Sequence, residues 1–331
     1  MKVKHPFHIA GYGTAFPANK VTSSALEARL DLPAGWSERY SGVKERYHVD
    51  TDTNASLGAE AARRALQNAG LEFADIDLLI SASATFDRIL PHQSSLLKHA
   101  LDPRDAQDTA TFDLNSSCLS FVTALDTAAR RLDDDCRHIL IVSSEIASRG
   151  LDPADPKTAT LFGDAAAAFI LTRDKTGTHG SLKYRQKTYS AGVHGATIIG
   201  GGSEHYFTRE AFDPSLLYFK MESKALLRMA LLHLKPFMQD FFADLPIELT
   251  DLDLFIPHQA SKTGLAAFQN MFNLPPEKIF LNLATQGNCI AASIPTALAQ
   301  ALSQGRIQSG DTVMLAGTSA GFGIGALLLK I

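Results

Sequence analysis

A cysteine, a histidine and an asparagine stand out in this chain as side chains that could act in nucleophilic catalysis. The cysteine, Cys118, follows the strand-like segment 111–115 (TFDLN) and opens an apolar, helix-like segment (LSFVTALDTAARRL). Unpaired N–H groups and the positive end of the helix dipole stabilise a thiolate at such a junction, so the position predicts a lowered pKa for the Cys118 thiol. The alternative is a buried and inert thiol, as most free cysteines are. We assign Cys136 and Cys289 to that class.

His258 ends an apolar segment (DLFIPHQ) that predicts a strand. Ligand sites of open α/β sheets form at strand ends, and a histidine there can act as a base, an acid or a hydrogen-bond donor. Asn288 lies in a glycine-containing turn (TQGNCIAASIP) before a predicted helix, where its amide could donate to a developing oxyanion. The alternatives are a structural histidine and a turn asparagine that serves only the backbone.

The elements that must position these residues alternate between helix and strand. Residues 56–69 are rich in alanine and end before a glycine, which is typical of a helix. Short, continuous apolar runs predict buried strands. The remaining expected elements are strands at 76–82, 111–114, 138–143 and 166–171 and a helix at 118–132. This alternation predicts an α/β protein with buried sheets.

The second half of the chain echoes the first. Residues 74–80 (ADIDLLI) resemble residues 250–256 (TDLDLFI) at an offset of 176, and a second short match, TAL, recurs at an offset of 173. The shared order of the matches predicts a duplication with halves at about 1–172 and 173–331. No Pro/Ser-rich linker divides the halves, so we expect them to pack as one body.

The composition narrows the class of protein. In 331 residues, 45% are apolar and 20% charged, which excludes disorder, and the net charge of −4 argues against a dedicated nucleic-acid binder. Three irregularly spaced cysteines indicate free thiols in a reducing compartment. The N-terminus lacks the features of a signal peptide, and no apolar run reaches the ~18 residues of a membrane span. We therefore expect a cytoplasmic protein that does not enter a membrane.

Taken together, the three candidate residues and their surroundings resemble the β-ketoacyl-acyl carrier protein synthase III family of the thiolase superfamily. The resemblance covers nearly the whole chain and rests on several motifs in the same order. These are residues 35–46 (GWSERYSGVKER), 115–121 (NSSCLSF), 161–168 (LFGDAAAA), 257–260 (PHQA) and 287–295 (GNCIAASIP), followed by a C-terminal glycine loop (GTSAGFGIG).

The resemblance implies a five-layer αβαβα fold built from two similar halves. It also implies two half-reactions, in which Cys118 takes an acyl group from a thioester and the acyl-enzyme then condenses with a malonyl thioester as CO2 leaves. His258 and Asn288 would donate hydrogen bonds to the enolate that decarboxylation forms. The substrates would be coenzyme A or phosphopantetheine thioesters, with no metal or other cofactor. The family resemblance further implies a homodimer in which a loop, here residues 86–92, reaches the partner's acyl pocket.

Supporting roles follow from the same resemblance. The oxyanion hole would use the backbone N–H groups of Cys118 and of Gly321 in the glycine loop. The acyl pocket is assigned to Leu90, Leu119 and Phe121. Leu90 replaces an aromatic wall, which predicts a medium-length acyl donor rather than acetyl.

The carrier half of each substrate has its own candidates. Trp36 matches a residue that stacks on the adenine of coenzyme A, and Ser261 matches the thioester-binding region. The helix that follows Ser261 is expected to carry no basic residue for an acyl carrier protein. The candidates for docking such an acidic partner are spaced by four residues on a helix expected to begin near Phe219. They are Lys220, Lys224 and Arg228. A solvated charged face is the alternative.

The departures from the family pattern leave several functions open. The arginine that completes the adenine clamp falls at about Pro156-Lys157, and Leu119 and Ser120 add bulk beside the cysteine. They leave open both the start of fatty-acid synthesis and a specialised or secondary-metabolite pathway. An acyltransferase that passes the acyl group on without decarboxylation is a second function, and a non-catalytic partner subunit is a third. The complete Cys, His and Asn set favours decarboxylation.

Overall fold

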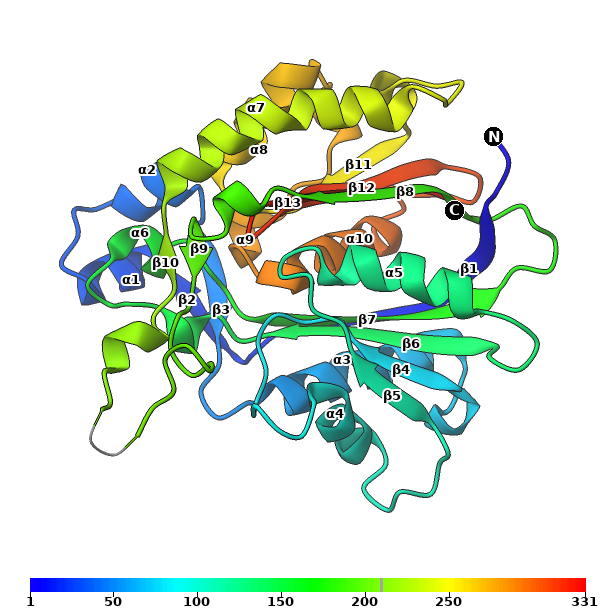
Figure 1. Cartoon of the computed structure of the whole chain (residues 1–331), viewed down its shortest axis with the longest axis horizontal. Helices are drawn as coiled ribbons and strands as arrows, with labels where there is room; N and C mark the ends of the chain where they lie inside the picture. Colours follow the sequence, from blue (N-terminus) through cyan, green and yellow to red (C-terminus); the bar gives the residue numbers. More distant parts are fainter. Residues whose placement is uncertain (209–210) are drawn as a thin grey trace.

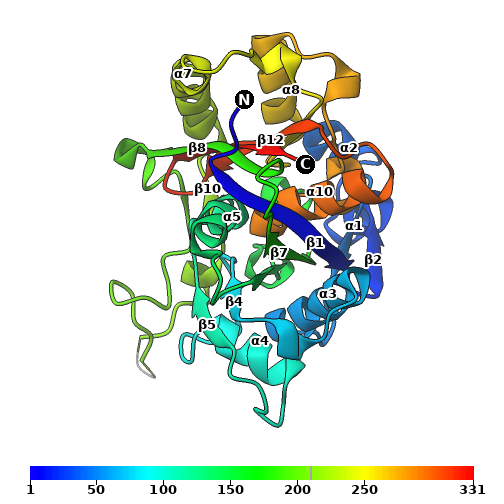
Figure 2. The same ribbon diagram turned by 90° about the vertical axis from the view of Figure 1, so that its right-hand side faces the viewer.

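The computed structural model describes residues 1–208 and 211–331 and arranges them in five layers (Figure 1). Two layers of helices form the outer faces, a β-sheet lies beneath each, and a third helical layer lies between the sheets (Figures 1 and 2). From one face to the other, the helices are α7 (Ser223–Phe242) and α8 (Lys262–Phe272), then α5 (Ser120–Arg131) and α10 (Ser293–Ser303), then α3 (Asn54–Ala69) and α4 (Gln93–Leu101). The expected five-layer α/β fold is confirmed.

The strands of the two sheets follow one another in the order β11-β12-β13-β8-β1-β7-β6-β4-β5. The two sheets join where His5 of β1 pairs with Ser181 of β8. The strands are β1 (His5–Ala15), β4 (Leu78–Ser81), β5 (Ala110–Asp113), β6 (His138–Glu145), β7 (Ala165–Arg173), β8 (Gly180–Thr188), β11 (Leu254–Pro257), β12 (Thr312–Ser319) and β13 (Gly323–Lys330).

The two sheets repeat one topology. In the first, β1 and β7 are antiparallel, as are β7 and β6, whereas β6 and β4 are parallel. In the second, β8 and β13, β13 and β12, and β12 and β11 repeat those directions. The duplicated architecture is therefore present in the strand pairing. The division at residues 172 and 173 stays a prediction, and the turn that joins β7 to β8 lies next to it.

Shorter elements gather at one end of the layers, on the left in Figure 1. They are β2 (Asn19–Thr22), α1 (Ser23–Arg29), α2 (Trp36–Ser41), β3 (Glu45–His48), α6 (Pro156–Ala159), β9 (Ala196–Thr197) and β10 (Lys220–Met221). Two very short helices, α9 (Leu283–Gln286) and the 3-10 turn η7 (Ile290–Ala292), flank the segment that holds Asn288.

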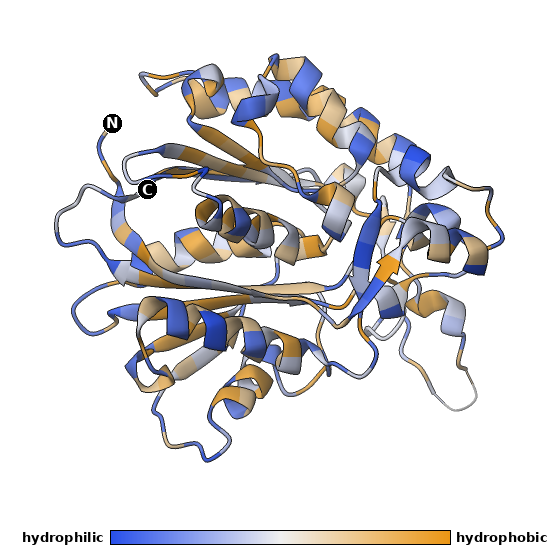
Figure 3. Cartoon of the chain, turned by 180° about the vertical axis from the view of Figure 1, so that it is seen from behind, coloured by the Kyte–Doolittle hydropathy of each residue, from blue (hydrophilic) through white to orange (hydrophobic). Residues whose placement is uncertain are grey.

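Alanine and glycine set the spacing between α3 and its sheet. A Cβ atom at Gly11 of β1 would lie 2.4 Å from the carbonyl oxygen of Ala65, and one at Gly13 would lie 2.5 Å from that of Ala61. The absence of side chains at both glycines lets the alanine-rich face of α3 rest directly on the strand. Apolar residues run along the strands of both sheets (Figure 3), so the layers stack through continuous apolar faces.

Two expected helix starts are wrong. The helix after Cys118 begins at Ser120, because Ser117 has a φ of 55° and turns the chain sharply before the helix. The helix expected near Phe219 begins at Ser223. Lys220 lies instead in β10, where it pairs with Thr197 of β9. Thr197 lies 23 positions before Lys220 (220 − 197), so the spacing of neighbouring residues could not predict this strand pairing.

Candidate active site

Cys118 lies in a tight turn between β5 and α5. The amide of Leu119 donates to the carbonyl of Ser116 (3.2 Å), and the amide of Ser120 donates to that of Ser117 (3.0 Å). Ser117 has a φ of 55°, a left-handed conformation that is uncommon for residues other than glycine and costs free energy. The turn leaves Cys118 partly exposed at the start of the helix, while Leu119 is fully buried.

The environment of the thiol opposes ionisation. Burial raises the pKa of Cys118 from 9.0 to about 11, and the nearby carboxylate of Glu145 acts in the same direction. The Ser117 hydroxyl and the backbone N–H groups of Ala320 and Cys118 lower the pKa but do not compensate. Burial and Glu145 therefore act against the lowered pKa that the helix N-terminus predicts for Cys118. A pKa of about 11 keeps Cys118 as a thiol at physiological pH.

His258 follows the last residue of β11 and is held by its backbone. Its amide donates to the carbonyl of Ala316 in β12 (2.8 Å). The side chain lies against Gly317, where a Cβ atom would lie 2.5 Å from the Cβ of His258. Burial lowers the pKa of His258 to about 4, so the imidazole is neutral at physiological pH. Its Nδ1 is buried and has no hydrogen-bond partner among the described residues.

Asn288 is fixed on both sides of its backbone. Its amide donates to the carbonyl of Leu161 (2.9 Å), and its carbonyl accepts from the amide of Gly163 (3.1 Å). The side-chain Nδ2 donates to the carbonyl of Ala260 (3.2 Å), and Oδ1 accepts from the amide of Ile290 (2.9 Å). The Asn288 side chain therefore stabilises the backbone of its own turn, which was the alternative role considered for it. It also binds the segment that follows His258.

The structure joins the three candidate residues through two shared segments. The β12–β13 hairpin supplies the Ala320 amide that faces Cys118 and the Gly317 that packs on His258. The segment after β11 carries His258 and the Ala260 carbonyl that binds Asn288. The amide that faces the thiol is that of Ala320, the neighbour of the expected Gly321, which turns the hairpin with a φ of 74°.

The three residues assigned to the acyl pocket do not lie together within a single copy of the chain. Leu119 and Phe121 are fully buried in the central core. Leu119 packs on β13, where a Cβ atom at Gly325 would lie 3.0 Å from its Cδ1, and the Phe121 ring lies 5.1 Å from that of Phe169. Leu90 is 81% exposed on the loop before α4. Leu119 and Phe121 face the core because α5 lies between two sheets, and their assignment to an acyl pocket stays a prediction.

The carrier candidates fall into two groups. Trp36 begins α2 and stacks on Tyr40, with ring centroids 4.8 Å apart and planes 12° from parallel. Ser261 caps α8 by accepting from the amide of Gly264 (3.1 Å). Helices α2 and α8 meet, since a Cβ atom at Gly42 would lie 2.9 Å from the Cβ of Lys262. Trp36 and Ser261 therefore belong to adjoining helices.

The second group lies elsewhere. Lys224 and Arg228 are exposed on α7, one turn apart, whereas Lys220 is exposed on β10. The expectation that the helix after Ser261 has no basic residue is wrong, because α8 begins at Lys262. A serine before a helical segment is a local cap signal that could have set this start.

Sequence reasoning also missed Gln259, the neighbour of His258. Its side chain is fully buried and makes four hydrogen bonds. Nε2 donates to the carbonyls of Pro257 (2.8 Å) and Phe280 (3.3 Å), and Oε1 accepts from the amides of Asn282 and Leu283 (both 3.2 Å). The amide group therefore ties the end of β11 to the segment that leads to Asn288.

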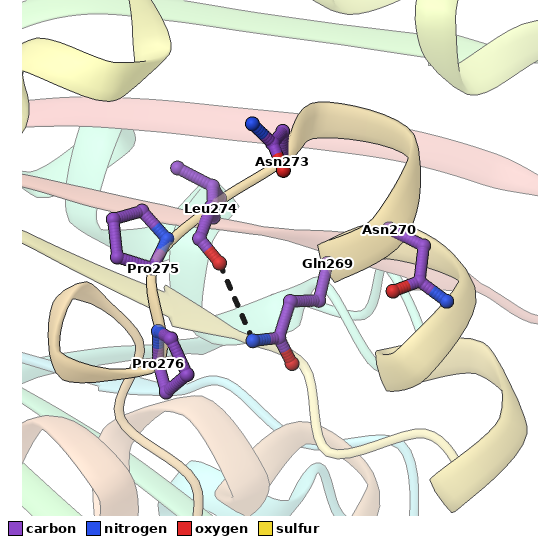
Figure 4. Close-up of a pocket in the computed structure, with 6 residues that line it drawn as sticks. All are labelled: Gln269, Asn270, Asn273, Leu274, Pro275 and Pro276. Atoms are coloured by element: carbon purple, nitrogen blue, oxygen red, sulfur yellow. Dashed lines mark hydrogen bonds between the residues drawn. The ribbon is translucent and has the colours of Figure 1, made fainter.

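A surface pocket of about 500 Å³ lies at the C-terminal end of α8 (Figure 4). It is lined by Gln269, Asn270, Asn273, Leu274, Pro275 and Pro276, and none of the predicted site residues is among them. Within the described residues, no group of three or more His, Cys, Asp or Glu side chains is placed to hold a metal ion. In the same part of the chain, no helix is both long and apolar enough to cross a membrane.

Comparisons with known proteins agree across the chain. The family model for 3-oxoacyl-[acyl-carrier-protein] synthase III matches residues 112–190. The model for the C-terminal part of the same family matches residues 242–331. A β-ketoacyl-[acyl-carrier-protein] synthase III of Sphingopyxis alaskensis is 33% identical over 326 residues, 98% of each chain. The solved 3-oxoacyl-[acyl-carrier-protein] synthase III of Aquifex aeolicus has a TM-score of 0.87 at 28% identity and covers 98% of this chain and 100% of its own. The priming β-ketosynthase of a polyketide biosynthetic pathway has a TM-score of 0.87 at 25% identity and covers 100% and 98%.

Proposed function

The chain belongs to the β-ketoacyl-[acyl-carrier-protein] synthase III family of condensing acyltransferases, and we propose that Cys118 carries the acyl group between its two half-reactions. In the first, the Cys118 sulfur attacks the carbonyl carbon of an acyl thioester, and the carrier leaves as a thiol with the proton that Cys118 gives up. In the second, a malonyl thioester loses CO2 and the carbon of its enolate attacks the acyl-Cys118 carbonyl. A carbon–carbon bond forms as the carbon–sulfur bond to Cys118 breaks, which releases a 3-oxoacyl thioester. Cys118 leaves as a thiolate and takes up a proton from solvent to return to the thiol.

The protonation states of the site suit these steps. Cys118 rests as a thiol because its pKa is about 11, and the small thiolate fraction is a strong nucleophile for a thioester. The amides of Ala320 and Cys118 interact with the sulfur, which supports a role for both in binding the oxyanion that forms on attack. The raised pKa also slows reaction of the resting thiol with other electrophiles.

His258 and Asn288 serve the second half-reaction. Decarboxylation builds negative charge on the oxygen of the malonyl thioester. A neutral imidazole carries one N–H donor, and the Asn288 amide carries two. Because both side chains are buried, their hydrogen bonds stabilise the enolate more than water does, and the loss of one such donor costs ~10²–10³ in rate.

The observation that carries this proposal is that the β12–β13 hairpin and the segment after β11 join three residues that are distant in sequence. Cys118 lies beside the Ala320 amide, His258 packs on Gly317, and Asn288 donates to Ala260 two positions after His258. Simple acyl transfer has no use for a buried amide and a buried neutral imidazole beside the acylated thiol. The acyltransferase without decarboxylation is therefore disfavoured.

The experiment supplies an acyl thioester together with a malonyl thioester labelled in its free carboxylate. We expect one labelled CO2 for each 3-oxoacyl product, and Cys136→Ala as the matched control should behave like the wild type. Cys118→Ala should give no condensed product. A product that keeps the labelled carboxylate would contradict the proposal and support acyl transfer alone.

The substrates and the assembly extend the proposal. The acyl and malonyl groups arrive as thioesters of coenzyme A or of an acyl carrier protein, and no metal or other cofactor takes part. The position of Trp36 and Ser261 on adjoining helices, with Lys262 beside Ser261, supports a role for this region in binding the carrier. The exposed apolar side chains of Phe86, Ile89 and Leu90 support a homodimer in which this loop is covered by the second copy. The three free thiols support a cytoplasmic location.

The pathway is the remaining part of the proposal. Condensation of this kind serves fatty-acid biosynthesis in the family. The solved polyketide priming β-ketosynthase has the same fold over the whole chain. With Pro156-Lys157 at the place of the family's clamp arginine, this chain departs from the family pattern on the carrier side. This departure supports a specialised, secondary-metabolite role.

A further inference from the structure

Glu145 is a fully buried carboxyl group that the half-reactions described above do not use. It is the last residue of β6, and its Oε1 accepts from the amide of Ala84 (2.6 Å). Its Oε2 accepts from the amide of Thr85 (2.9 Å) and from the Thr85 hydroxyl (2.6 Å). The backbone N–H of Ala291 also favours the ionised form. We propose that Glu145 is a positioning residue that fixes the loop after β4 and the turn after Asn288 around Cys118.

The hydrogen bonds of Glu145 connect segments that are distant in sequence. Ala84 and Thr85 form the base of the loop that carries the exposed side chains from Phe86 to Leu90. Ala291 lies in η7, whose first residue, Ile290, donates to Asn288 Oδ1. One carboxylate therefore binds the base of a loop proposed to reach the partner and also interacts with the turn that holds the Asn288 amide.

The Thr85 hydroxyl extends this network. It lies 3.2 Å from Asn54 Oδ1 at the start of α3, and it accepts from the amide of Ile146 (3.1 Å). The residue after Glu145 thus binds the same side chain as Glu145 itself. A substitution of Glu145 is therefore expected to disturb Asn54 and Ile146 as well, because all three residues contact the same Thr85 hydroxyl group.

The charge of Glu145 acts on the nucleophile. Burial raises the pKa of Glu145 to about 7 in spite of its four donors. Two titratable groups feel its charge, Cys118 from the β5–α5 turn and Cys289 from the turn before η7. Asp164, at the start of β7, adds to the effect on Cys289. From the loop after β4, Ala84 and Thr85 bind Glu145 and do not titrate, whereas Asp87 of that loop accepts from the amides of Asn54 and Ala55. The ionised carboxylate therefore disfavours the Cys118 thiolate.

The charge of Glu145 and its hydrogen bonds have opposite effects on the rates of the two half-reactions. This contrast rests on the proposed function. Removal of the charge eases ionisation of Cys118 and favours attack on the acyl thioester. Loss of the hydrogen bonds loosens the Asn288 turn and slows condensation. A residue that only stabilised the fold would slow both half-reactions together.

The test compares Glu145→Gln with Asp174→Asn. Asp174 is a matched control, because it is also a buried carboxylate that accepts from several amides, those of Thr176, Thr178 and His179, in the β7–β8 turn. With Glu145→Gln we expect modification of Cys118 by methyl methanethiosulfonate at pH 8 to be roughly threefold faster or more. We expect the kcat of condensation to fall on the order of 10–100-fold, and Asp174→Asn to change neither quantity.

A second variant keeps the test decisive if Glu145→Gln does not fold. Glu145→Asp keeps the charge and shortens the side chain, so the thiol should react as in the wild type while condensation still falls. An unchanged thiol rate together with an unchanged kcat in Glu145→Gln overturns the proposal, as does wild-type condensation by Glu145→Asp. Thiol modification needs no substrate, so it stays informative even if the wild type fails to condense and the proposed function is wrong.

Discussion

The raised pKa of Cys118 makes a quantitative prediction about the resting enzyme. Burial moves the pKa from 9.0 to about 11, so at pH 8 the thiol contains about 100-fold less thiolate than an unperturbed cysteine. The more basic thiolate is the better nucleophile, which recovers about eightfold of that difference. We therefore expect folded Cys118 to react roughly tenfold more slowly at pH 8 than the same residue in the unfolded chain.

The assay measures modification by methyl methanethiosulfonate from pH 7 to pH 11. The Cys136→Ser variant removes the partly exposed second thiol, and Cys289 is buried with a raised pKa. The same variant in guanidinium chloride gives the unperturbed reference. A raised pKa keeps the neutral form dominant at higher pH, so the rate for Cys118 should still be rising above pH 9.

A rate that levels off below pH 9, or that exceeds the unfolded reference at pH 8, would refute this reasoning. It would mean that the helix N-terminus and the Ser117 hydroxyl outweigh desolvation at this site. The original expectation from the sequence would then be correct, and the site would hold a thiolate before substrate binds.

Three further predictions test the roles of other groups. His258→Ala and Asn288→Ala should still accept an acyl group from a thioester but lose ~10²–10³ in malonyl decarboxylation, measured as labelled CO2; wild-type condensation by both would contradict their roles. Reversal of charge in Lys224→Glu with Arg228→Glu should raise the KM for a substrate on an acyl carrier protein and leave that for the coenzyme A thioester unchanged, with a weaker salt dependence. Light scattering at micromolar concentration should give a homodimer, and a fully active ~36 kDa monomer would argue against a loop 86–92 that completes the partner's site.

The sequence predicted the features that depend on near neighbours. Apolar runs of four or more residues placed β4, β6 and β7, and the alanine-rich helix α3 ends at Ala69 as expected. The candidate residues Cys118, His258 and Asn288 each fall in a short segment that turns the chain at the end of a strand or before a helix. Such segments have local signals, so their positions could be read before the fold was known.

The sequence could not predict effects that come from distant parts of the chain. The pKa of Cys118 is raised by burial and by Glu145, which lies on β6 and is distant from the thiol in sequence. Leu119 and Phe121 face the core because α5 lies between two sheets, a fact that no window around the cysteine contains. Lys220 lies in a strand and not in the expected helix, because β10 pairs with β9.

The central claim is that Cys118 holds the acyl group that is condensed, and peptide mass spectrometry tests it most directly. The enzyme is treated with an acyl thioester, digested and mapped, and a second sample receives a malonyl thioester before digestion. We predict an adduct on the peptide that contains Cys118, its disappearance in the second sample, and a matching amount of 3-oxoacyl product. An adduct on Cys136 or Cys289, with Cys118→Ala still active, would contradict the account.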